Sequence, residues 1–504
     1  MKTRQQKITE RLERFREAPI EGEPTFTASN IHYDASFRIQ ALTHGTIGLV
    51  HKMVRELGLI DLIDQEIELL KRHLPYHESD HVLNIAYNVL CGGHTLDDLE
   101  LLRNNETYLK ALGTTAIPDP TTAGDFCRRF AVDQIYALME VINSIRVKVW
   151  KQQQSGFFDI ARVDLDGVLV PTLGECKEGM DISYKGTWGY HALVASLANT
   201  QEPLFLVNRP GNRPSHEGAA AIIDKCIPLL QEAGFRRIVL RGDTDFALTA
   251  NFDRWDANSI VKFVFGIDAS ENLTGIADDY PEDFYEELQR HVNQADVKVT
   301  RRERPENVKN VIVERRGYKQ LVLESEDIGE FEYRPGKCAQ NYRIVFIRKN
   351  IDVKHFGKVS MTETRYFFYI TNDWDLSMEE VVWEANQRCN QENLGAQLLN
   401  GVHALRAPLK TLESNWAYMV ITSLAWSLKA WMGLSLPETG TAIEKADDAA
   451  AKQKILGMEF RTFVNAMMAI PCQIIETGRK VVYRIIGWKP MMPVFVRLTT
   501  VFNC

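Results

Sequence analysis

Residues 161–172 read ARVDLDGVLVPT, and this stretch decides the fold class. Apolar and polar residues alternate through it, which is typical of a β-strand. Two further strand-like runs follow, HALVASLAN at 191–199 and EPLFLVNRPG at 202–211, with the turn-like Thr200–Gln201 between them. No helical pattern separates the three runs. We therefore expect three consecutive strands that form a meander.

The pattern changes to alternating helices and strands after residue 211. HEGAAAIIDKCIPLLQEAG at 216–234 predicts a helix closed by Gly234. RRIVLRGDTDF at 236–246 predicts a strand, ALTANFDRWDAN at 247–258 a short helix, and IVKFVFGID at 260–268 another strand. Connection rules place the fourth strand beside the first and parallel to it. The order β-β-β-α-β-α-β is that of a ribonuclease H-like core, an α/β fold.

Other regions flank this core. The expected regions are a charged tail (1–35), an all-helical domain (36–155), the first part of the core (156–270), a β-rich insertion (271–364), the second part of the core (365–435) and a C-terminal segment (436–504). The insertion rests on short strand-like runs such as VKNVIVERR at 308–316. After it, RYFFYITN at 365–372 predicts the last strand, and residues 377–400 predict one long helix.

Composition excludes several classes of protein. The chain has 504 residues, 45% of them hydrophobic, and a net charge of −8, so DNA binding would need a local basic patch rather than a basic total. None of the eight cysteines forms a C-x-x-C pair, which predicts a reducing cytosol. The N-terminus lacks the apolar region of a signal peptide. Residues 416–434 are too polar for a confident membrane span, so we expect a buried helix and a cytoplasmic protein with no membrane partner.

Acidic residues converge on one edge of the predicted sheet. Asp164 and Asp166 lie two residues apart on the first strand and share a face. Asp243 ends the fourth strand, so Asp166 and Asp243 meet at the carboxyl ends of parallel neighbours, where open α/β sheets usually bind ligands. Glu392, in the helix after the last strand, can reach the same edge. Oxygen ligands suit Mg²⁺ or Mn²⁺. Two such ions roughly 4 Å apart can activate a water or a 3′-hydroxyl against a phosphodiester.

Four segments carry a resemblance to a known family. They are VDLDGVLVPT (163–172), SYKGTWGYHALVASLANTQEPLFLVNRPGNRPSHEG (183–218), LRGDTDFALTANFDRWD (240–256) and NQRCNQENLGAQLLNG (386–401). With them the chain resembles the DDE transposases of bacterial insertion sequences, in the branch called transposase DDE domain group 1. The resemblance covers most of the chain. It implies an enzyme that cuts DNA at the ends of its own element and joins those ends to target DNA.

The resemblance assigns the catalytic and metal-binding residues. The first Asp of such enzymes precedes a small residue on the first strand, here Asp166 before Gly167. The second follows Arg-Gly, here Asp243. The third acidic residue is the Glu of an Arg-x-x-x-Glu-Asn helix, here Glu392 with Arg388. The resemblance therefore implies that these three carboxylates bind two divalent metal ions, Mg²⁺ or Mn²⁺.

The resemblance also implies partners, and the chain departs from the family pattern at two positions. A β-strand domain between the second Asp and the Glu is matched by residues 271–364, and residues 36–155 hold the place of a DNA-end-binding domain. The implied partners are the terminal inverted repeats of the element, target DNA and a second copy in a DNA-bound homodimer. Relatives carry a Tyr and a Lys that bind DNA phosphates at the positions where this chain has Ala385 and Leu399. Phosphate binding must therefore be weaker in this protein or come from other residues.

Basic residues outside the carboxylate cluster are candidate DNA contacts. Residues 298–319 carry eight Lys or Arg against three Glu, and Arg301, Arg302 and Arg304 lead that run. DNA backbone contact and a solvated hairpin face both account for them, and we favour DNA contact. Arg388 either binds phosphate or pairs with Glu392 one helical turn later. A last group either lines the active-site edge or stabilises turns; its members are Lys185, Trp188, Tyr190, Arg213 and His216.

Two other functions remain open from the sequence. VDLDGVLV resembles the first motif of haloacid-dehalogenase-type phosphatases, with Asp164 as nucleophile and Asp166 as acid and base. That fold needs a helix after its first strand unit, and it leaves Glu392 without a role. The other alternative is a catalytically silent DNA-binding protein derived from a transposase. Loss of a carboxylate would indicate it, and all three are present.

Overall fold

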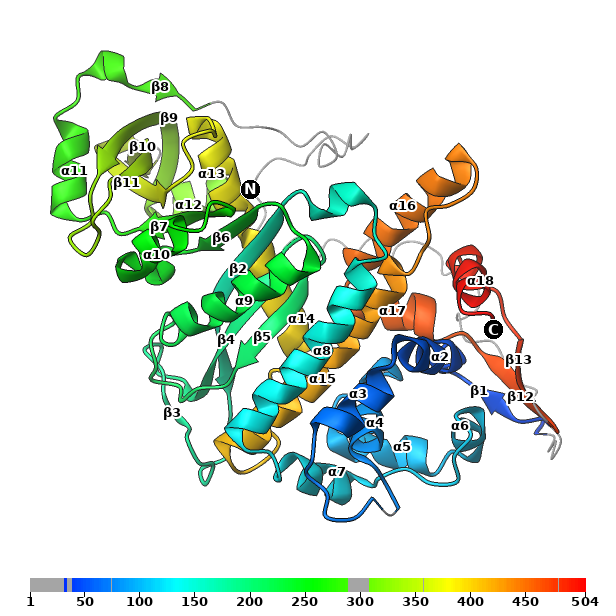
Figure 1. Cartoon of the computed structure of the whole chain (residues 1–504). Helices are drawn as coiled ribbons and strands as arrows, with labels where there is room; N and C mark the ends of the chain where they lie inside the picture. The colour runs from blue at the N-terminus through cyan, green and yellow to red at the C-terminus, as the bar shows by residue number, and fades with distance from the viewer. Residues whose placement is uncertain (1–30, 34–38, 74, 289–307, 357, 479) are drawn as a thin grey trace, which may run out of the picture. The chain divides into compact units, whose positions relative to one another are not determined.

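The computed structural model describes residues 31–33, 39–73, 75–288, 308–356, 358–478 and 480–504. Residues Ala41–Cys504 form one compact unit of mixed α/β structure (Figure 1). The candidate DNA contacts Arg301, Arg302 and Arg304 lie outside the described residues. The domain boundaries expected above stay predictions.

Strand β2 (Ala161–Pro171) is the strand that decided the fold class, and it lies between β4 and β6. It pairs antiparallel with β4 (Trp188–Leu197), which pairs antiparallel with β5 (Glu202–Val207), so the expected meander is present. On its other side β2 pairs parallel with β6 (Ile238–Gly242), which pairs parallel with β7 (Val261–Ile267). The predicted position and direction of the fourth strand are thus confirmed.

Helix α9 (Ala219–Ala233) provides the crossover between the meander and β6. It packs on β2, β4, β5 and β6. Gly234 ends it with φ 102°, a left-handed conformation that favours glycine, so the predicted end of this helix is confirmed. A short helix α10 (Phe252–Asp256) then leads to β7.

The strands after residue 271 continue the same sheet. Strand β11 (Lys358–Thr371) pairs antiparallel with β7, and then follow β10 (Tyr342–His355), β9 (Gln320–Tyr333) and the short β8 (Glu286–Glu287). Together with β3 (Asp181–Ile182) beside β4, ten strands form one sheet within the described residues. The strand expected at 365–372 is the second half of β11, so the expected boundary at 364 falls inside a strand.

Two local predictions were wrong. VKNVIVERR forms helix α12 (Val308–Arg315) rather than a strand, because its β-branched run is followed by Gly317 at φ 64°, which lets the Tyr318 amide close the helix on the Val313 carbonyl. The long helix expected at 377–400 is two helices, α13 (Met378–Gln387) and α14 (Cys389–Asn400). They meet at Arg388.

The other helices include one long helix, α15, that is buried along almost its whole length. They are α2 (Ile47–Leu57), α3 (Leu59–Glu66), α4 (Glu78–Leu90), α5 (Leu99–Arg103), α6 (Glu106–Ala111), α7 (Pro120–Cys127), α8 (Val132–Trp150), α11 (Glu271–Asp278), α15 (Leu412–Leu434), α16 (Ala442–Leu456), α17 (Phe460–Phe463) and α18 (Met492–Val501). Helix α15 contacts α2, α4, α7, α8, α16 and β5. Every residue from Ser414 to Leu434 is buried, as expected for a helix that is apolar on all sides.

A second, three-stranded sheet corrects the all-helical prediction for the front region. Strand β1 (Ala41–Leu42) pairs with β12 (Cys472–Thr477), which pairs with β13 (Lys480–Ile485). A two-residue strand is too short to show the alternation on which a sequence-based prediction depends. The front region is therefore joined to the C-terminal segment by backbone hydrogen bonds.

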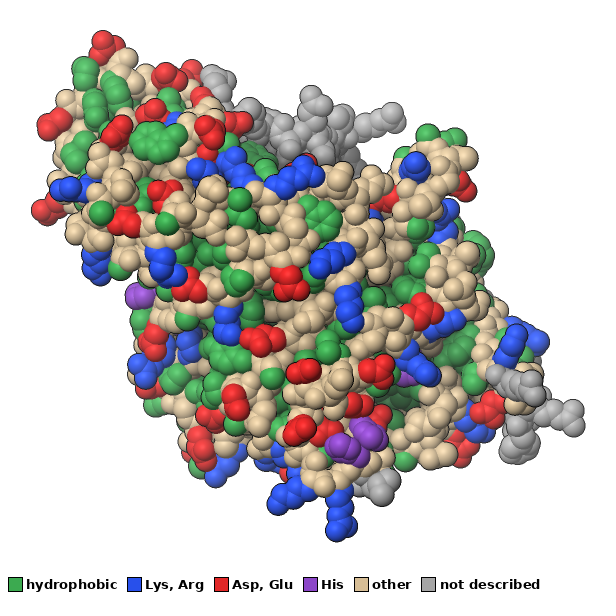
Figure 2. Space-filling model, in the orientation of Figure 1, with side chains coloured by type: hydrophobic (Ala, Val, Ile, Leu, Met, Phe, Trp, Pro, Cys, Tyr) green, Lys and Arg blue, Asp and Glu red, His purple; other side chains and the backbone are tan. Residues whose placement is uncertain are grey.

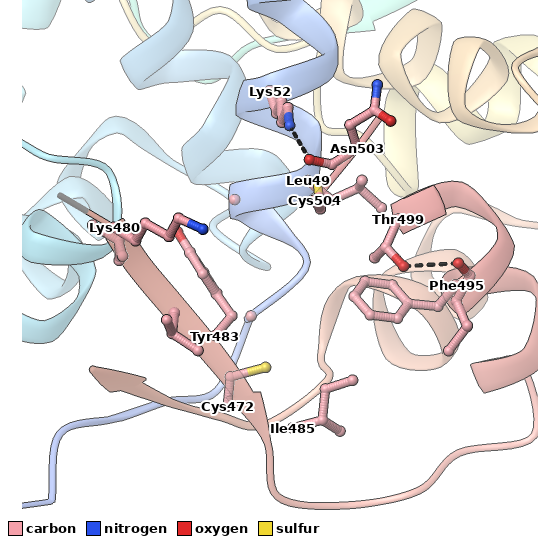
Figure 3. A pocket seen from close by; sticks show the side chains of 15 residues that line it. Leu49, Lys52, Cys472, Lys480, Tyr483, Ile485, Phe495, Thr499, Asn503 and Cys504 are labelled. Carbon is pink, nitrogen blue, oxygen red and sulfur yellow. Dashed lines mark hydrogen bonds between the residues drawn. The ribbon is translucent and has the colours of Figure 1, made fainter. Parts of the chain in front are cut away.

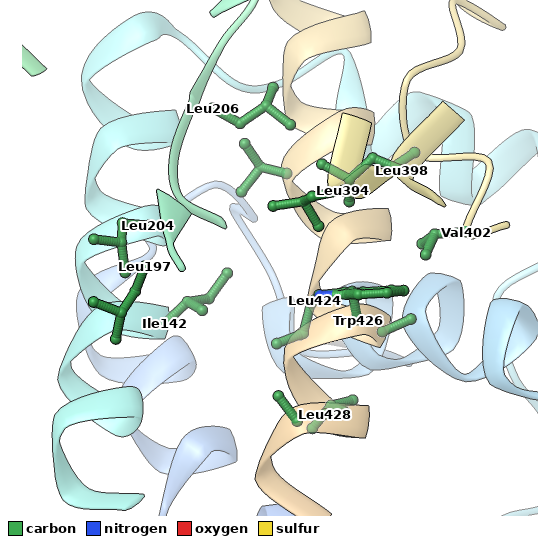
Figure 4. Close-up of a cluster of buried hydrophobic side chains, with 14 of the residues drawn as sticks. Ile142, Leu197, Leu204, Leu206, Leu394, Leu398, Val402, Leu424, Trp426 and Leu428 are labelled. Carbon is green, nitrogen blue, oxygen red and sulfur yellow. The ribbon is translucent and has the colours of Figure 1, made fainter. Parts of the chain in front are cut away.

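The core is continuous between the large sheet and the helices. Figure 4 shows Ile142 of α8, Leu204 of β5, Leu398 of α14 and Leu424 of α15 in one cluster, and all four are buried. On the face shown in Figure 2, acidic and basic side chains are interspersed. None of the helices in the described part of the chain is long and apolar enough to cross a membrane.

Lys429 predicts a pH dependence of stability. Burial lowers its pKa to about 7, and its Nζ donates to the Leu456 carbonyl at 2.9 Å. The unfolded chain keeps this proton up to about pH 10.4. Between these pH values the unfolded state binds the extra proton, so stability rises with pH, by about 1.4 kcal/mol per unit. Urea denaturation from pH 6 to 9 should show this rise in the wild type and less of it in Lys429→Met. The exposed Lys454→Met is the control, and equal pH slopes for Lys429→Met and the wild type would contradict the assignment.

Candidate active site

The register of two parallel strands brings Asp166 level with Asp243. Asp164 on β2 is the partner of Arg241 on β6, and the strands part directly after this pair. Two residues further on, Asp166 continues along β2 and Asp243 follows the end of β6, and the Asp243 carboxylate adds to the raised pKa of Asp166. The sequence predicted this juxtaposition, and the structure makes it.

Backbone amides fix the orientation of both aspartates. Asp166 accepts a hydrogen bond from the Gly167 amide at 2.9 Å. Asp243 begins a short 3-10 turn and accepts from the Asp245 amide at 3.1 Å. Gly242 just before it has no room for a side chain, because an added Cβ would lie 2.6 Å from the Phe246 Cβ. The chain therefore turns sharply where Asp243 leaves the sheet.

Arg388 connects the second aspartate to the glutamate. Its guanidinium lies 3.9 Å from an Asp243 carboxylate oxygen and 3.9 Å from a Glu392 carboxylate oxygen. The Arg388 side chain is 17% exposed, whereas that of Glu392 is 68% exposed. Helices α13 and α14 cover this side of the sheet, since α13 packs on β6 and β7 and α14 packs on β2. The three carboxylates and one arginine thus come from the middle of β2, the residue after β6, and the start of α14.

Burial and the neighbouring charges raise the pKa of both aspartates. Burial raises the pKa of Asp166 to about 6; Arg388 opposes this rise, and Asp243 and Glu392 add to it. Burial also raises the pKa of Asp243, with Arg388 again opposing and Asp245 and Glu392 adding. One arginine does not neutralise three carboxylates, so the site favours a further positive charge.

The donor set fits a hard divalent cation in kind. Carboxylate oxygens are the ligands that Mg²⁺ and Mn²⁺ prefer, and burial, together with the nearby Asp243 and Glu392, raises the pKa of Asp166. In the described part of the chain, however, no three acidic, histidine or cysteine side chains lie close enough together to hold an ion as they stand. Arg388 lies between two of the three carboxylates instead.

Asp164 belongs to a buried ion cluster rather than to the open site. Both of its carboxylate oxygens accept from Arg241, at 2.6 Å and 2.9 Å, and it is 1% exposed. Arg241 also donates to Glu384 of α13 at 3.0 Å, and Arg162 of β2 donates to the same carboxylate. Burial lowers the pKa of Arg241, but Asp164 and Glu384 outweigh this and raise it. Local sequence patterns could not reveal Arg162, Arg241 and Glu384 as part of this cluster, because these residues lie far apart in the sequence.

A buried arginine and a buried histidine, also missed from the sequence, hold the loop beside β2. Arg209 donates to the carbonyls of His191, Pro214, Ser215 and Glu217. The His191 ring contacts the Arg213 carbonyl at 2.7 Å from its Nδ1. Its Nε2 would lie 2.5 Å from a Cβ added to Gly167, next to Asp166. The loop that carries Arg213 is therefore anchored against β2.

The other candidate DNA contacts differ in their surroundings. Arg213 is exposed and lies 3.6 Å from Glu217. Lys185 is exposed in the turn between β3 and β4, with its amine 5.3 Å from the centre of the Tyr184 ring. Trp188 is 53% exposed at the start of β4. Tyr190 is buried, and its hydroxyl donates to the Glu178 carbonyl, which gives it a structural contact.

One comparison with known protein families identifies the class of protein. The family model described as transposase DDE domain group 1 matches residues 40–501. No curated protein matches the sequence significantly. Among solved structures, the chain is similar to piggyBac transposase in a synaptic complex with hairpin DNA. The two are 11% identical, the match covers 84% of this chain and 83% of that chain, and the TM-score is 0.32.

The buried cluster predicts a large loss of stability on substitution. Arg241→Met removes the partner of Asp164 and leaves a buried charge unpaired, which should lower the free energy of unfolding by about 3–5 kcal/mol. The matched control is Arg236→Met, since Arg236 pairs with Asp159 on the surface and should contribute under about 1 kcal/mol. Urea denaturation of both variants measures the difference. Equal losses would show that the cluster does not stabilise the fold.

Proposed function

The chain belongs to the transposase DDE domain group 1 family, and from this premise we propose that it is the transposase of a bacterial insertion sequence. It cleaves phosphodiester bonds at the terminal inverted repeats of its own element and transfers the freed strands to target DNA. The observation that carries the proposal is the convergence of Asp166, Asp243 and Glu392 around Arg388. The five strands β5-β4-β2-β6-β7 then correspond to a ribonuclease H-like core.

We propose that Asp166, Asp243 and Glu392 hold two Mg²⁺ or Mn²⁺ ions. Such ions activate the attacking water or 3′-hydroxyl and stabilise the leaving oxygen. The chain's own residues supply the placement. Gly167 and Asp245 orient the two aspartates through their amides, and Arg388 offers a guanidinium that can bind a DNA phosphate beside them. The reaction proceeds in a homodimer bound to two element ends.

The phosphatase alternative is not supported. An Asp164 nucleophile would need a free carboxylate oxygen that faces substrate, but both oxygens bond to Arg241 in a buried cluster. No hydrolysis of p-nitrophenyl phosphate is therefore expected. If the protein hydrolysed that ester through an aspartyl-phosphate intermediate, the phosphatase assignment would be correct instead of the transposase assignment. A silent DNA-binding protein lacks support, since all three carboxylates are present.

The deciding experiment uses end-labelled DNA with the termini of the flanking element. We expect cleavage with Mg²⁺ or Mn²⁺ and none after chelation. Asp166→Asn and Glu392→Gln should abolish cleavage but keep binding to the DNA ends, because each removes a carboxylate from the site and no packing contact. Exposed Glu459→Gln is the matched control. Full cleavage by Glu392→Gln would remove that residue from the site.

The basic segment predicts nonspecific DNA contact. The triple variant Arg301→Ala, Arg302→Ala and Arg304→Ala should weaken binding about equally across DNA sequences. It should also flatten the dependence of log affinity on log salt by about one unit for each lost phosphate contact. Alanine at exposed Arg236, Arg254 and Arg461 gives the same change of charge elsewhere as a control. An unchanged salt slope in the 301–304 variant would make that segment an ordinary solvated surface.

A further inference from the structure

None of the three site carboxylates lines the cavity of about 650 Å³ that Figure 3 shows beside β12 and β13. Glu392 is 68% exposed, and its contact with Arg388 is 3.9 Å long. Because solvent surrounds most of this side chain, its position relative to Asp166 depends on how helix α14 is fixed to the sheet.

The residue before Glu392 is buried and bonds to strand β4. Gln391 is 3% exposed, and Ser196 is 1% exposed. The Ser196 hydroxyl donates to the Gln391 Oε1, and the Gln391 Nε2 donates to the Val194 carbonyl at 3.4 Å. One buried amide therefore ties the first turn of α14 to two residues of β4.

The register of the sheet shows where these two contacts lie. Val194 is the antiparallel partner of Asp166, and Ser196 is the partner of Asp164. Directly opposed side chains of an antiparallel pair lie on the same face of the sheet. Ser196 therefore lies on the face that carries both aspartates. Gln391 thus contacts the partner residue of each aspartate.

A glycine one helical turn later gives α14 a second close contact with the sheet. A Cβ added to Gly395 would lie 3.2 Å from the Cγ2 of Val168, two residues beyond Asp166 on β2. Residues four apart share a face of a helix, so Gln391 and Gly395 both face the sheet. Two contacts one turn apart set the rotation of α14 and its position along β2 and β4.

The apolar contacts of α14 do not fix that position by themselves. Leu394 and Leu398 are buried in the core cluster that Figure 4 shows. The free energy of apolar burial follows the area buried and has no direction, so such contacts tolerate small sliding or rotation of the helix. A hydrogen bond weakens steeply as its angle changes. The Gln391 amide therefore supplies a directional contact that the leucines do not.

We propose that Gln391 is the positioning residue of Glu392, with Ser196 as its anchor on β4. Its amide holds the first turn of α14 so that the Glu392 carboxylate stays at the edge where the two aspartates lie. This inference rests on the proposed function, because it gives Gln391 a part in holding the same divalent ions. Gln391 is buried, so it acts through Glu392 and not on DNA.

The test compares Gln391→Met with Gln397→Met in the full chain. Both remove one glutamine amide from α14 and keep the side-chain length; the Gln397 Oε1 accepts from the Phe460 amide at 3.0 Å. Both should shift the midpoint of urea denaturation by similar amounts. Only Gln391→Met should lower the affinity for Mn²⁺, by about tenfold, and the cleavage rate at saturating DNA ends, by about 10–100-fold. The paramagnetic resonance signal of free Mn²⁺ measures the affinity, and metal-free binding of DNA ends should not change.

Ser196→Ala removes the anchor without altering α14 itself. It should lower the Mn²⁺ affinity as Gln391→Met does, and the double variant should lose little more, because both substitutions break one contact. Wild-type Mn²⁺ affinity and cleavage rate in Gln391→Met would overturn the proposal. Full additivity of the two substitutions would also overturn it.

Amide hydrogen exchange separates failure of this proposal from failure of the proposed function, because it needs neither metal nor DNA. Gln391→Met should speed exchange at residues 392–395, and Gln397→Met should leave exchange there unchanged. If the wild type cleaves no DNA but this pattern is found, Gln391 still positions Glu392 and the transposase assignment is wrong. Unchanged exchange at residues 392–395 in Gln391→Met would show that Gln391 does not position this turn.

Discussion

The bidentate hydrogen bond between Arg241 and Asp164 is the interaction on which the site depends. It joins β2 to β6 in parallel register, and through Glu384 it fixes α13 over the same face of the sheet. The cluster has two arginines and two carboxylates, so its charges cancel and its buried groups are hydrogen-bonded, which is the condition for burying ions without a large penalty. With this register set, Asp166 and Asp243 come level where the strands part.

The sequence could predict the parts of the fold that depend on local periodicity. The meander of β2, β4 and β5 and the parallel β6 follow from alternation, short connections and the handedness of crossovers. The role of Asp164 could not be predicted in the same way. Its partner lies 77 residues away, and Glu384 lies 143 residues from Arg241. From the sequence alone, a carboxylate on this face of the strand could be a catalytic group or a partner in a buried ion pair.

Local sequence patterns also could not predict the elements whose structure depends on partners far away in the sequence. Strand β11 runs for 14 residues, but only its second half is apolar enough to read as a strand. Its first half is held by a register with β10 that begins at a hairpin. Strand β1 is two residues long and exists through its pairing with β12. The α12 segment shows the reverse case, in which β-branched residues with high strand propensity form a helix.

Arg388, at the junction of α13 and α14, lies near two carboxylates. It keeps helical dihedral angles, φ −57° and ψ −24°, so Glu392 lies one helical turn further on the same face. The Arg388 guanidinium lies between Asp243 and Glu392. Three carboxylates and one guanidinium leave two negative charges, and the pKa of Asp166 rises to about 6 in consequence of burial and of this excess. The three carboxylates therefore leave this site with a net negative charge, which favours a further positive charge beside them.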